Sequence, residues 1–182
     1  MALKATICKA DLQIADMDRN YYASHSLTIA RHPSENDERM MVRLLAFALN
    51  ANEDLAFTKG LCDTDEPDIW QKDLTGAVEL WIELGQPDEK RLRQSCARAK
   101  QVVVYTYSGR AAEIWWDDIK GKAQRFANLS VCNIPVDAVQ GLARLAGRSM
   151  ALQCTVQEGQ VWLANGEESV LVEPESWKDG CQ

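Results

Sequence analysis

Apolar and polar residues alternate at both ends of the chain. Residues 4–14 and 22–30 follow the period of two that is typical of half-buried strands, which predicts an N-terminal β-hairpin. Residues 150–156 and 161–164 alternate in the same way around a Gly-containing turn and predict a C-terminal hairpin. The polar segment after Glu173 is expected to be loose.

Between the hairpins the pattern switches several times between the helical and the strand period. Ser34 is a candidate N-cap, and the apolar residues after it predict a helix that ends near Asn50. Pro87 suits the first position of a second helix. The elements expected after the first helix are strands 55–58, 67–72 and 77–84, helix 87–100, strand 101–107, helix 111–126, strand 129–134 and helix 136–146. This order predicts a single α/β domain over residues 1–182.

The composition is that of an ordinary globular domain, with 182 residues, 46% of them hydrophobic and 26% charged. No apolar run approaches the length of a membrane helix, and the first residues lack the parts of a signal peptide. A cytoplasmic location is therefore expected. The net charge of −7 argues against a protein that coats nucleic acid nonspecifically.

The cysteines and histidines form no motif that is typical of a metal site or of nucleophilic catalysis. No cysteine lies in a C-x-x-C pair, so reduced and mostly buried thiols are expected. His25 and His32 are the two histidines, and a local structural role is expected for His32 because it precedes Pro33 at a helix start. The six cysteines are Cys8, Cys62, Cys96, Cys132, Cys154 and Cys181.

Carboxylates gather in the middle of the chain. Glu38 falls on or beside the apolar stripe of the first helix, where a charge requires a cation, an arginine or water. In the hairpin that turns at 73–76, pairing Lys72 with Ala77 would set Glu66 opposite Glu83.

The same register would set Asp68 opposite Trp81 and diagonal to Glu83, all on one face of the sheet. Opposed carboxylates are destabilising unless something compensates, and a divalent cation is the usual partner of hard oxygen ligands. Two interpretations are open: Glu66, Asp68 and Glu83 form a metal site for Mg²⁺ or Mn²⁺, or they form an acidic solvent-facing surface.

The second helix carries a basic strip on an acidic protein. It would either meet the phosphates of a nucleic acid or form a solvated helix face. Trp70, Trp81, Trp115 and Trp116 would either stack on bases or anchor the core. The strip consists of Lys90, Arg91, Arg93, Arg98 and Lys100.

The acidic hairpin resembles the signature of the PD-(D/E)XK nucleases. Its residues are Glu66-Pro67-Asp68 and, after the turn, Val78-Glu-Leu-Trp-Ile-Glu83. Glu38 stands where those enzymes often carry an acidic residue on the first core helix. The resemblance implies a restriction-endonuclease-like core (helix, three strands, helix, strand) over about 34–107.

Nearly the whole chain also resembles the bacterial YaeQ family, a variant of the same fold with no established activity. The stretches that carry this match are Ala30-Arg-His-Pro-Ser-Glu, Glu38-Arg-Met-Met, Gly60-Leu-Cys, Leu80-Trp-Ile-Glu-Leu-Gly85, Pro87-Asp-Glu, Ala112-Glu-Ile-Trp-Trp116 and Phe126-Ala-Asn-Leu-Ser130.

One departure from the nuclease motif bears on activity. The motif places a lysine two residues after the glutamate, and here that residue is Gly85. Lys90 is the preferred substitute because it is close in sequence, with Lys72 and Lys100 as alternatives.

Two functions follow as hypotheses. One is a Mg²⁺-dependent phosphodiester hydrolase acting on nucleic acid, with Glu38, Asp68, Glu83 and Lys90 as catalytic residues. The other is a non-catalytic module that binds nucleic acid or protein and has lost nuclease chemistry.

Overall fold

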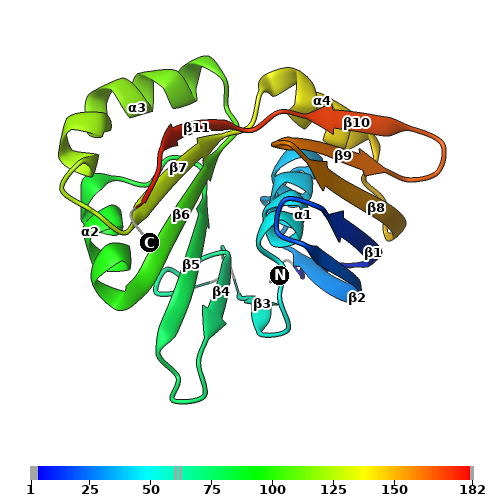
Figure 1. Cartoon of the computed structure of the whole chain (residues 1–182), viewed down its shortest axis with the longest axis horizontal. Helices are drawn as coiled ribbons and strands as arrows, with labels where there is room; N and C mark the ends of the chain where they lie inside the picture. The colour runs from blue at the N-terminus through cyan, green and yellow to red at the C-terminus, as the bar shows by residue number, and fades with distance from the viewer. Residues whose placement is uncertain (1–3, 60, 62, 181–182) are drawn as a thin grey trace. The chain divides into compact units, whose positions relative to one another are not determined.

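The computed structural model describes residues 4–59, 61 and 63–180, which cluster into two compact units, each built around its own sheet (Figure 1). The first unit comprises residues 1–49 and 137–174, and the second comprises residues 50–136 and 175–182. The fold is thus mixed α/β, with a five-stranded and a six-stranded sheet among the described residues. No helix in these ranges is long and apolar enough to cross a membrane.

The first unit is built on the two predicted hairpins, and both are confirmed. Its sheet has the strand order β10-β9-β8-β1-β2, in which β1 pairs antiparallel with β2 and parallel with β8. Its elements are β1 (Thr6–Asp16), β2 (Tyr21–Arg31), α1 (Asp37–Asn50), α4 (Val136–Arg144), β8 (Ser149–Gln157), β9 (Gln160–Ala164) and β10 (Ser169–Val172).

One face of this sheet is buried. Along β1 the even-numbered residues from Cys8 to Asp16 are buried and most of their neighbours are exposed, as the alternation predicts. Helix α1 contributes the apolar run from Met40 to Ala48. It contacts β2 through Phe47, whose ring lies 5.4 Å from the His25 ring in an edge arrangement.

The start of α1 differs from the prediction. The helix begins at Asp37, and Asn36 rather than Ser34 caps it, because the Asn36 side chain accepts a hydrogen bond from the Arg39 N–H at 2.8 Å. The Ser34 hydroxyl instead lies 2.6 Å from His32 Nδ1. His32 therefore has the local structural role that was expected of it.

The second unit holds a mixed sheet of order β11-β7-β6-β5-β4-β3. Strands β3, β4 and β5 are antiparallel, and β5, β6 and β7 are parallel, so the strands expected in the core do share one mixed sheet. Its elements are β3 (Leu55–Phe57), β4 (Ile69–Lys72), β5 (Val78–Leu84), α2 (Glu89–Arg98), β6 (Ala99–Thr106), α3 (Arg110–Ala123), β7 (Leu129–Asn133) and β11 (Glu175–Lys178). The expected core, about 34–107, thus takes its first helix mainly from the first unit and its strands and second helix from the second.

Helices α2 and α3 cover one face of the second sheet (Figure 1). Leu92 of α2 and Trp81 of β5 are at most 1% exposed and lie in the same cluster. The cluster consists of Trp81, Leu92, Ala99, Val102, Val104, Ile119, Ala123, Leu129 and Val131.

The segment after Glu173 forms strand β11 in the part that the structure describes, so the expectation of a loose tail is wrong. Strand β11 pairs antiparallel with β7. Within the second unit, the Lys178 ammonium donates to the carbonyls of Phe126 and Leu129, each at 2.8 Å. Strand β10 was also not predicted. The contacts of β11 are hydrogen bonds to residues that are distant in sequence, which a local pattern does not contain, whereas β10 pairs with the neighbouring strand β9.

Gly141 provides a test of the packing in the first unit. A Cβ on Gly141 of α4 would stand 2.9 Å from Val170 Cγ1 and 3.3 Å from its Cγ2. We expect Gly141→Ala to lower the free energy of unfolding by about 1–3 kcal/mol through overpacking. The measurement is urea denaturation of purified protein.

The matched control is Gly121→Ala in α3, where no heavy atom lies within 4 Å of the added Cβ. This change should raise the free energy of unfolding by about 0.5–1 kcal/mol, because alanine favours a helix more than glycine does. Equal effects of the two substitutions would contradict the packing of α4 against β10.

Candidate functional site

Glu83 is a buried carboxylate near the end of β5, in the second unit. Its Oε1 accepts hydrogen bonds from the Trp81 indole at 2.9 Å and from Arg91 Nε at 2.8 Å. Arg91 Nη2 also lies 2.6 Å from the same oxygen. A cation and a neutral donor therefore converge on the Glu83 carboxylate, and both come from its own unit.

Arg91 is held by the first turn of α2. Asp88 caps this helix by accepting a hydrogen bond from the Arg91 N–H at 2.8 Å, so the helix begins at Glu89, two residues after the predicted start at Pro87. Arg91 also donates to the carbonyl of Thr64 and, at 2.8 Å, to that of Glu66. One guanidinium thus joins α2, β5 and the segment before β4.

Sequence reasoning placed Arg91 in an exposed basic strip and missed this role. A signal was available, because Arg91 adjoins Leu92, the one large apolar residue between 89 and 98. The basic residue nearest to the buried stripe of a helix is the one most able to reach an acid on the neighbouring strand.

Burial raises the pKa of the Glu83 carboxyl above its ordinary value. This effect outweighs the Arg91 guanidinium and the hydrogen bonds from Arg91 and Trp81, which favour the charged form. The charge of Asp68 raises the pKa further. The Asp68 carboxylate therefore lies close enough to Glu83 to disfavour its charged form.

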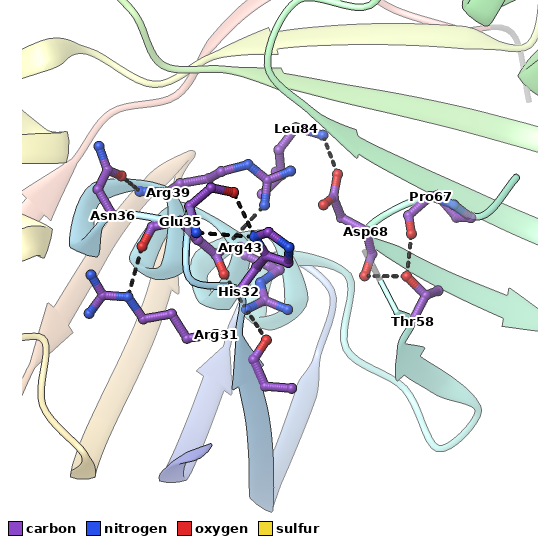
Figure 2. Close-up of polar contacts among 12 residues, drawn as sticks. Arg31, His32, Glu35, Asn36, Arg39, Arg43, Thr58, Pro67, Asp68 and Leu84 are labelled. Atoms are coloured by element: carbon purple, nitrogen blue, oxygen red, sulfur yellow. Dashed lines mark hydrogen bonds and ion pairs between the residues drawn. The ribbon is translucent and has the colours of Figure 1, made fainter. Parts of the chain in front are cut away.

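Asp68 is buried and lies just before β4 (Figure 2). Its Oδ2 accepts the Leu84 N–H at 2.9 Å, and its own N–H donates to the Ile82 carbonyl at 3.1 Å. Asp68 thus bonds to both chain neighbours of Glu83. Its carbonyl accepts from the Thr58 hydroxyl at 3.2 Å, which ties the segment to the end of β3.

The register of this hairpin differs from the prediction by two residues. Trp70, rather than Asp68, lies opposite Trp81, and the register shifts between Gln71 and Lys72 at a bulge. A shift of two residues keeps every side chain on its predicted face, because side chains alternate along a strand. Glu66 does not pair across the hairpin; it lies before β4 and accepts the Lys59 N–H at 3.1 Å.

These contacts determine how well the donor set fits a metal. The described residues contain no group of three or more His, Cys, Asp or Glu side chains placed to hold an ion. Oxygens of Glu66, Asp68 and Glu83 already accept from protein donors, and the Arg91 guanidinium lies where a cation would neutralise Glu83. The set as it stands does not fit a divalent ion.

Glu38 lies in α1 of the first unit and is half-buried. The buried carboxylate at this end of α1 is Glu35, which was not among the candidate site residues predicted from the sequence. Glu35 pairs with Arg43 at 2.9 Å and with Arg39 at 3.1 Å, and both pairs are largely buried (Figure 2). In the sequence, Arg39 and Arg43 follow Glu35 by four and eight residues, and this spacing was the available signal for the ion pairs.

Two other basic residues of α2 also have partners inside the second unit, and so does Lys100, which was expected in this helix but lies in β6. Arg98 donates to the Asp65 carbonyl at 2.7 Å, and its guanidinium lies 4.9 Å from the Trp81 ring centroid. Arg93 lies 3.5 Å from Glu89 on an exposed surface, and Lys100 lies 2.6 Å from Glu79. Lys90 is exposed.

The tryptophans have structural partners. Trp81 is fully buried, and Trp70 meets it edge-on with ring centroids 6.4 Å apart. The Trp115 indole donates to the Pro87 carbonyl at 2.8 Å, and Trp116 stacks on Trp177 at 6.0 Å. The second interpretation, of tryptophans as anchors, accounts for these contacts.

The described cysteines are free and at least partly buried, as expected. Burial raises the pKa of Cys96 to about 11 and that of Cys132 and Cys154 to about 12, so these thiols are protonated at neutral pH. Cys62 and Cys181 lie outside the described residues.

Replacing Arg91 tests the ion pair. We expect Arg91→Ala to lower the free energy of unfolding by about 2–4 kcal/mol at neutral pH, because it leaves Glu83 buried without its cation. The exposed Arg93, whose side chain is 64% accessible, provides the control, and Arg93→Ala should change stability by no more than about 0.5 kcal/mol.

The same pair of variants predicts a pH dependence. Loss of Arg91 raises the pKa of Glu83 further, so the protonated form favours folding and the ionised form opposes it. The loss of unfolding free energy caused by Arg91→Ala should therefore be largest at neutral pH. It should shrink as the pH falls toward 4.5, the ordinary pKa of a glutamate. A loss that is independent of pH would mean that Arg91 acts through packing alone.

Comparison with known proteins places this geometry in a family. The family model described as YaeQ protein matches residues 1–174. The chain is 47% identical over 178 residues to the uncharacterized protein YaeQ of Escherichia coli K12, and the match covers 98% of both. The YaeQ of Salmonella typhi is 45% identical over 178 residues, again 98% of each chain.

Two crystal structures have the same fold. YaeQ from Xanthomonas axonopodis pv. citri superposes with a TM-score of 0.93 at 48% identity, covering 96% of this chain and 98% of its own. YaeQ from Pseudomonas syringae superposes with a TM-score of 0.92 at 35% identity, covering 96% and 97%. The chain belongs to the YaeQ family.

Proposed function

We propose that this protein is a non-catalytic binding module that retains a nuclease-like arrangement of carboxylates and contacts nucleic acid through α2. The observation that carries the proposal is the Glu83–Arg91 ion pair. In a PD-(D/E)XK nuclease, the corresponding carboxylates would hold a divalent cation. Here a covalently attached guanidinium supplies the positive charge, and it cannot activate water as a metal does.

Gly85 supports the same conclusion. Strand β5 ends at Leu84, and Gly85 has a φ of +102°, a conformation that a lysine would adopt only with strain. The motif lysine is thus absent, and the local backbone is also unsuited to it.

The alternative lysines do not replace it. Lys72 lies opposite Val78, five residues along β5 from Glu83, which is roughly 17 Å. Lys100 lies beside Glu79, four residues along β5 from Glu83, which is roughly 13 Å. Lys90 adjoins Arg91 on α2, and adjacent helical residues point in different directions.

A Mg²⁺-dependent phosphodiester hydrolase remains the second candidate. Asp68 and Glu83 are both buried, and the charge of Asp68 raises the pKa of Glu83, which is the electrostatic situation that a divalent ion relieves. For such an ion to bind, Arg91 would have to leave the carboxylate and give up its bonds to two carbonyls.

The exposed side of α2, together with Lys100 at the start of β6, suits phosphates. Lys90, Arg93, Arg98 and Lys100 are exposed, although Arg93 and Lys100 pair with neighbouring glutamates. Exposed ion pairs contribute only about 0–1 kcal/mol, so these side chains can exchange a carboxylate for a phosphate at little cost. Arg91 stays with Glu83 and keeps the helix attached to the sheet.

A binding assay with nucleic acid tests the proposal. Labelled single- and double-stranded oligonucleotides should bind in EDTA, with no requirement for Mg²⁺, and they should remain intact after incubation with Mg²⁺ or Mn²⁺. Lys90→Glu should weaken binding to all sequences alike and reduce the slope of log K against log salt by about 1.

Lys9→Glu is the control, because Lys9 is an exposed residue of β1 in the other unit and the change in net charge is the same. It should leave both the affinity and the slope nearly unchanged. Cleavage that requires a divalent ion and is lost in Glu83→Gln would establish the hydrolase instead. Equal weakening by the two variants would exclude α2 as the contact surface.

A further inference from the structure

Strand β2 is a long, unprotected sheet edge. It pairs with β1 over all eleven residues, and no other strand of the described chain pairs with its outer side (Figure 1). The other strands that end the two sheets, β10, β3 and β11, have only three or four residues. Monomeric proteins usually protect such an edge because it can pair with another chain.

The usual protective features are absent from β2. It contains no proline and no lysine, and its pairing with β1 runs without a bulge. Its one charged residue, Arg31, lies at the end and pairs with Asp37. The strand therefore offers a straight and nearly neutral edge.

The hydrogen-bonding groups that face outward can be identified from β1. The Lys9 N–H donates to the Arg148 carbonyl, away from β2, so Lys9 does not exchange hydrogen bonds with Thr28 opposite it. The N–H and C=O of Thr28 therefore point outward from the sheet, and so do those of every second residue: Tyr22, Ser24 and Ser26. At Ala30 the carbonyl already accepts from Arg43 at 3.2 Å, which marks the end of the available edge.

The side chains of these residues are complementary to themselves under a two-fold axis. Ser24, Ser26 and Thr28 carry exposed hydroxyls at alternate positions. An antiparallel copy centred on Ser26 sets Ser26 against itself and Ser24 against Thr28, with no like charges opposed. Cross-strand Ser and Thr pairs of this kind stabilise a sheet.

We propose that β2 pairs antiparallel with β2 of a second copy of this chain, across a two-fold axis at Ser26, so that two sheets join into one. Each opposed pair of outward-facing residues then exchanges two backbone hydrogen bonds. The interface is isologous, as closed dimers require.

Charge does not oppose this pairing, although each copy carries −7. The acidic group nearest to the axis is Asp11 of β1, which accepts from the Ser26 hydroxyl at 3.0 Å. The two Asp11 residues would be separated by three strand spacings, roughly 14 Å, which exceeds the screening length at physiological salt.

Cysteine cross-linking tests the register. In Ser26→Cys the two Cα atoms across the axis would lie about 5.5 Å apart, within the range that a disulfide spans. In Thr28→Cys they would be offset by four residues, roughly 13 Å, which is out of reach. Oxidation should give a covalent dimer with Ser26→Cys but not with Thr28→Cys or the native chain. Equal cross-linking of the two variants would overturn the register.

Sedimentation or light scattering tests the association itself. The native chain should show a monomer–dimer equilibrium, and Ser26→Lys should weaken it roughly tenfold or more by opposing two ammonium groups. Gln153→Lys on the exposed face of β8, an interior strand, should leave it unchanged. Melting curves verify that both variants fold. A native chain that is monomeric up to its solubility limit, or a dimer that is unaffected by Ser26→Lys, would overturn the proposal.

Discussion

The second unit depends on one ion pair, between Glu83 of β5 and Arg91 of α2. A buried carboxylate without a partner costs several kcal/mol, so the sheet can carry Glu83 in this position only because a cation reaches it. The same guanidinium binds carbonyls of the segment before β4, where Asp68 begins its own contacts with β5. The Arg91 side chain thereby links α2, β5 and the segment before β4. It also occupies the place beside Glu83 that a metal ion would need.

The sequence predicted the parts of this arrangement that depend on local periodicity. It predicted the hairpin of β4 and β5, and it predicted a second helix after Pro87, although that helix begins two residues later, at Glu89. It did not predict the bulge between Gln71 and Lys72, because no glycine marks that position.

Elements that depend on distant partners were not predictable in this way. Strand β11 has only four residues, and the Lys178 ammonium anchors it by binding carbonyls about fifty positions earlier in the chain. The role of Arg91 was missed for a related reason. A strip of basic residues is defined by its charge, whereas its division into buried and solvent-facing members depends on which face of α2 meets the sheet.

The most direct test of the central claim is a crystal structure of the native protein grown with Mn²⁺, with anomalous scattering used to locate the metal. If the Glu83–Arg91 ion pair takes the place of a metal, there should be no anomalous peak within coordinating distance of the Glu83 and Asp68 oxygens, about 2.0–2.6 Å. Arg91 Nη2 should stay close to its 2.6 Å separation from Glu83 Oε1. A Mn²⁺ ion bound to both carboxylates, with Arg91 displaced into solvent, would contradict it.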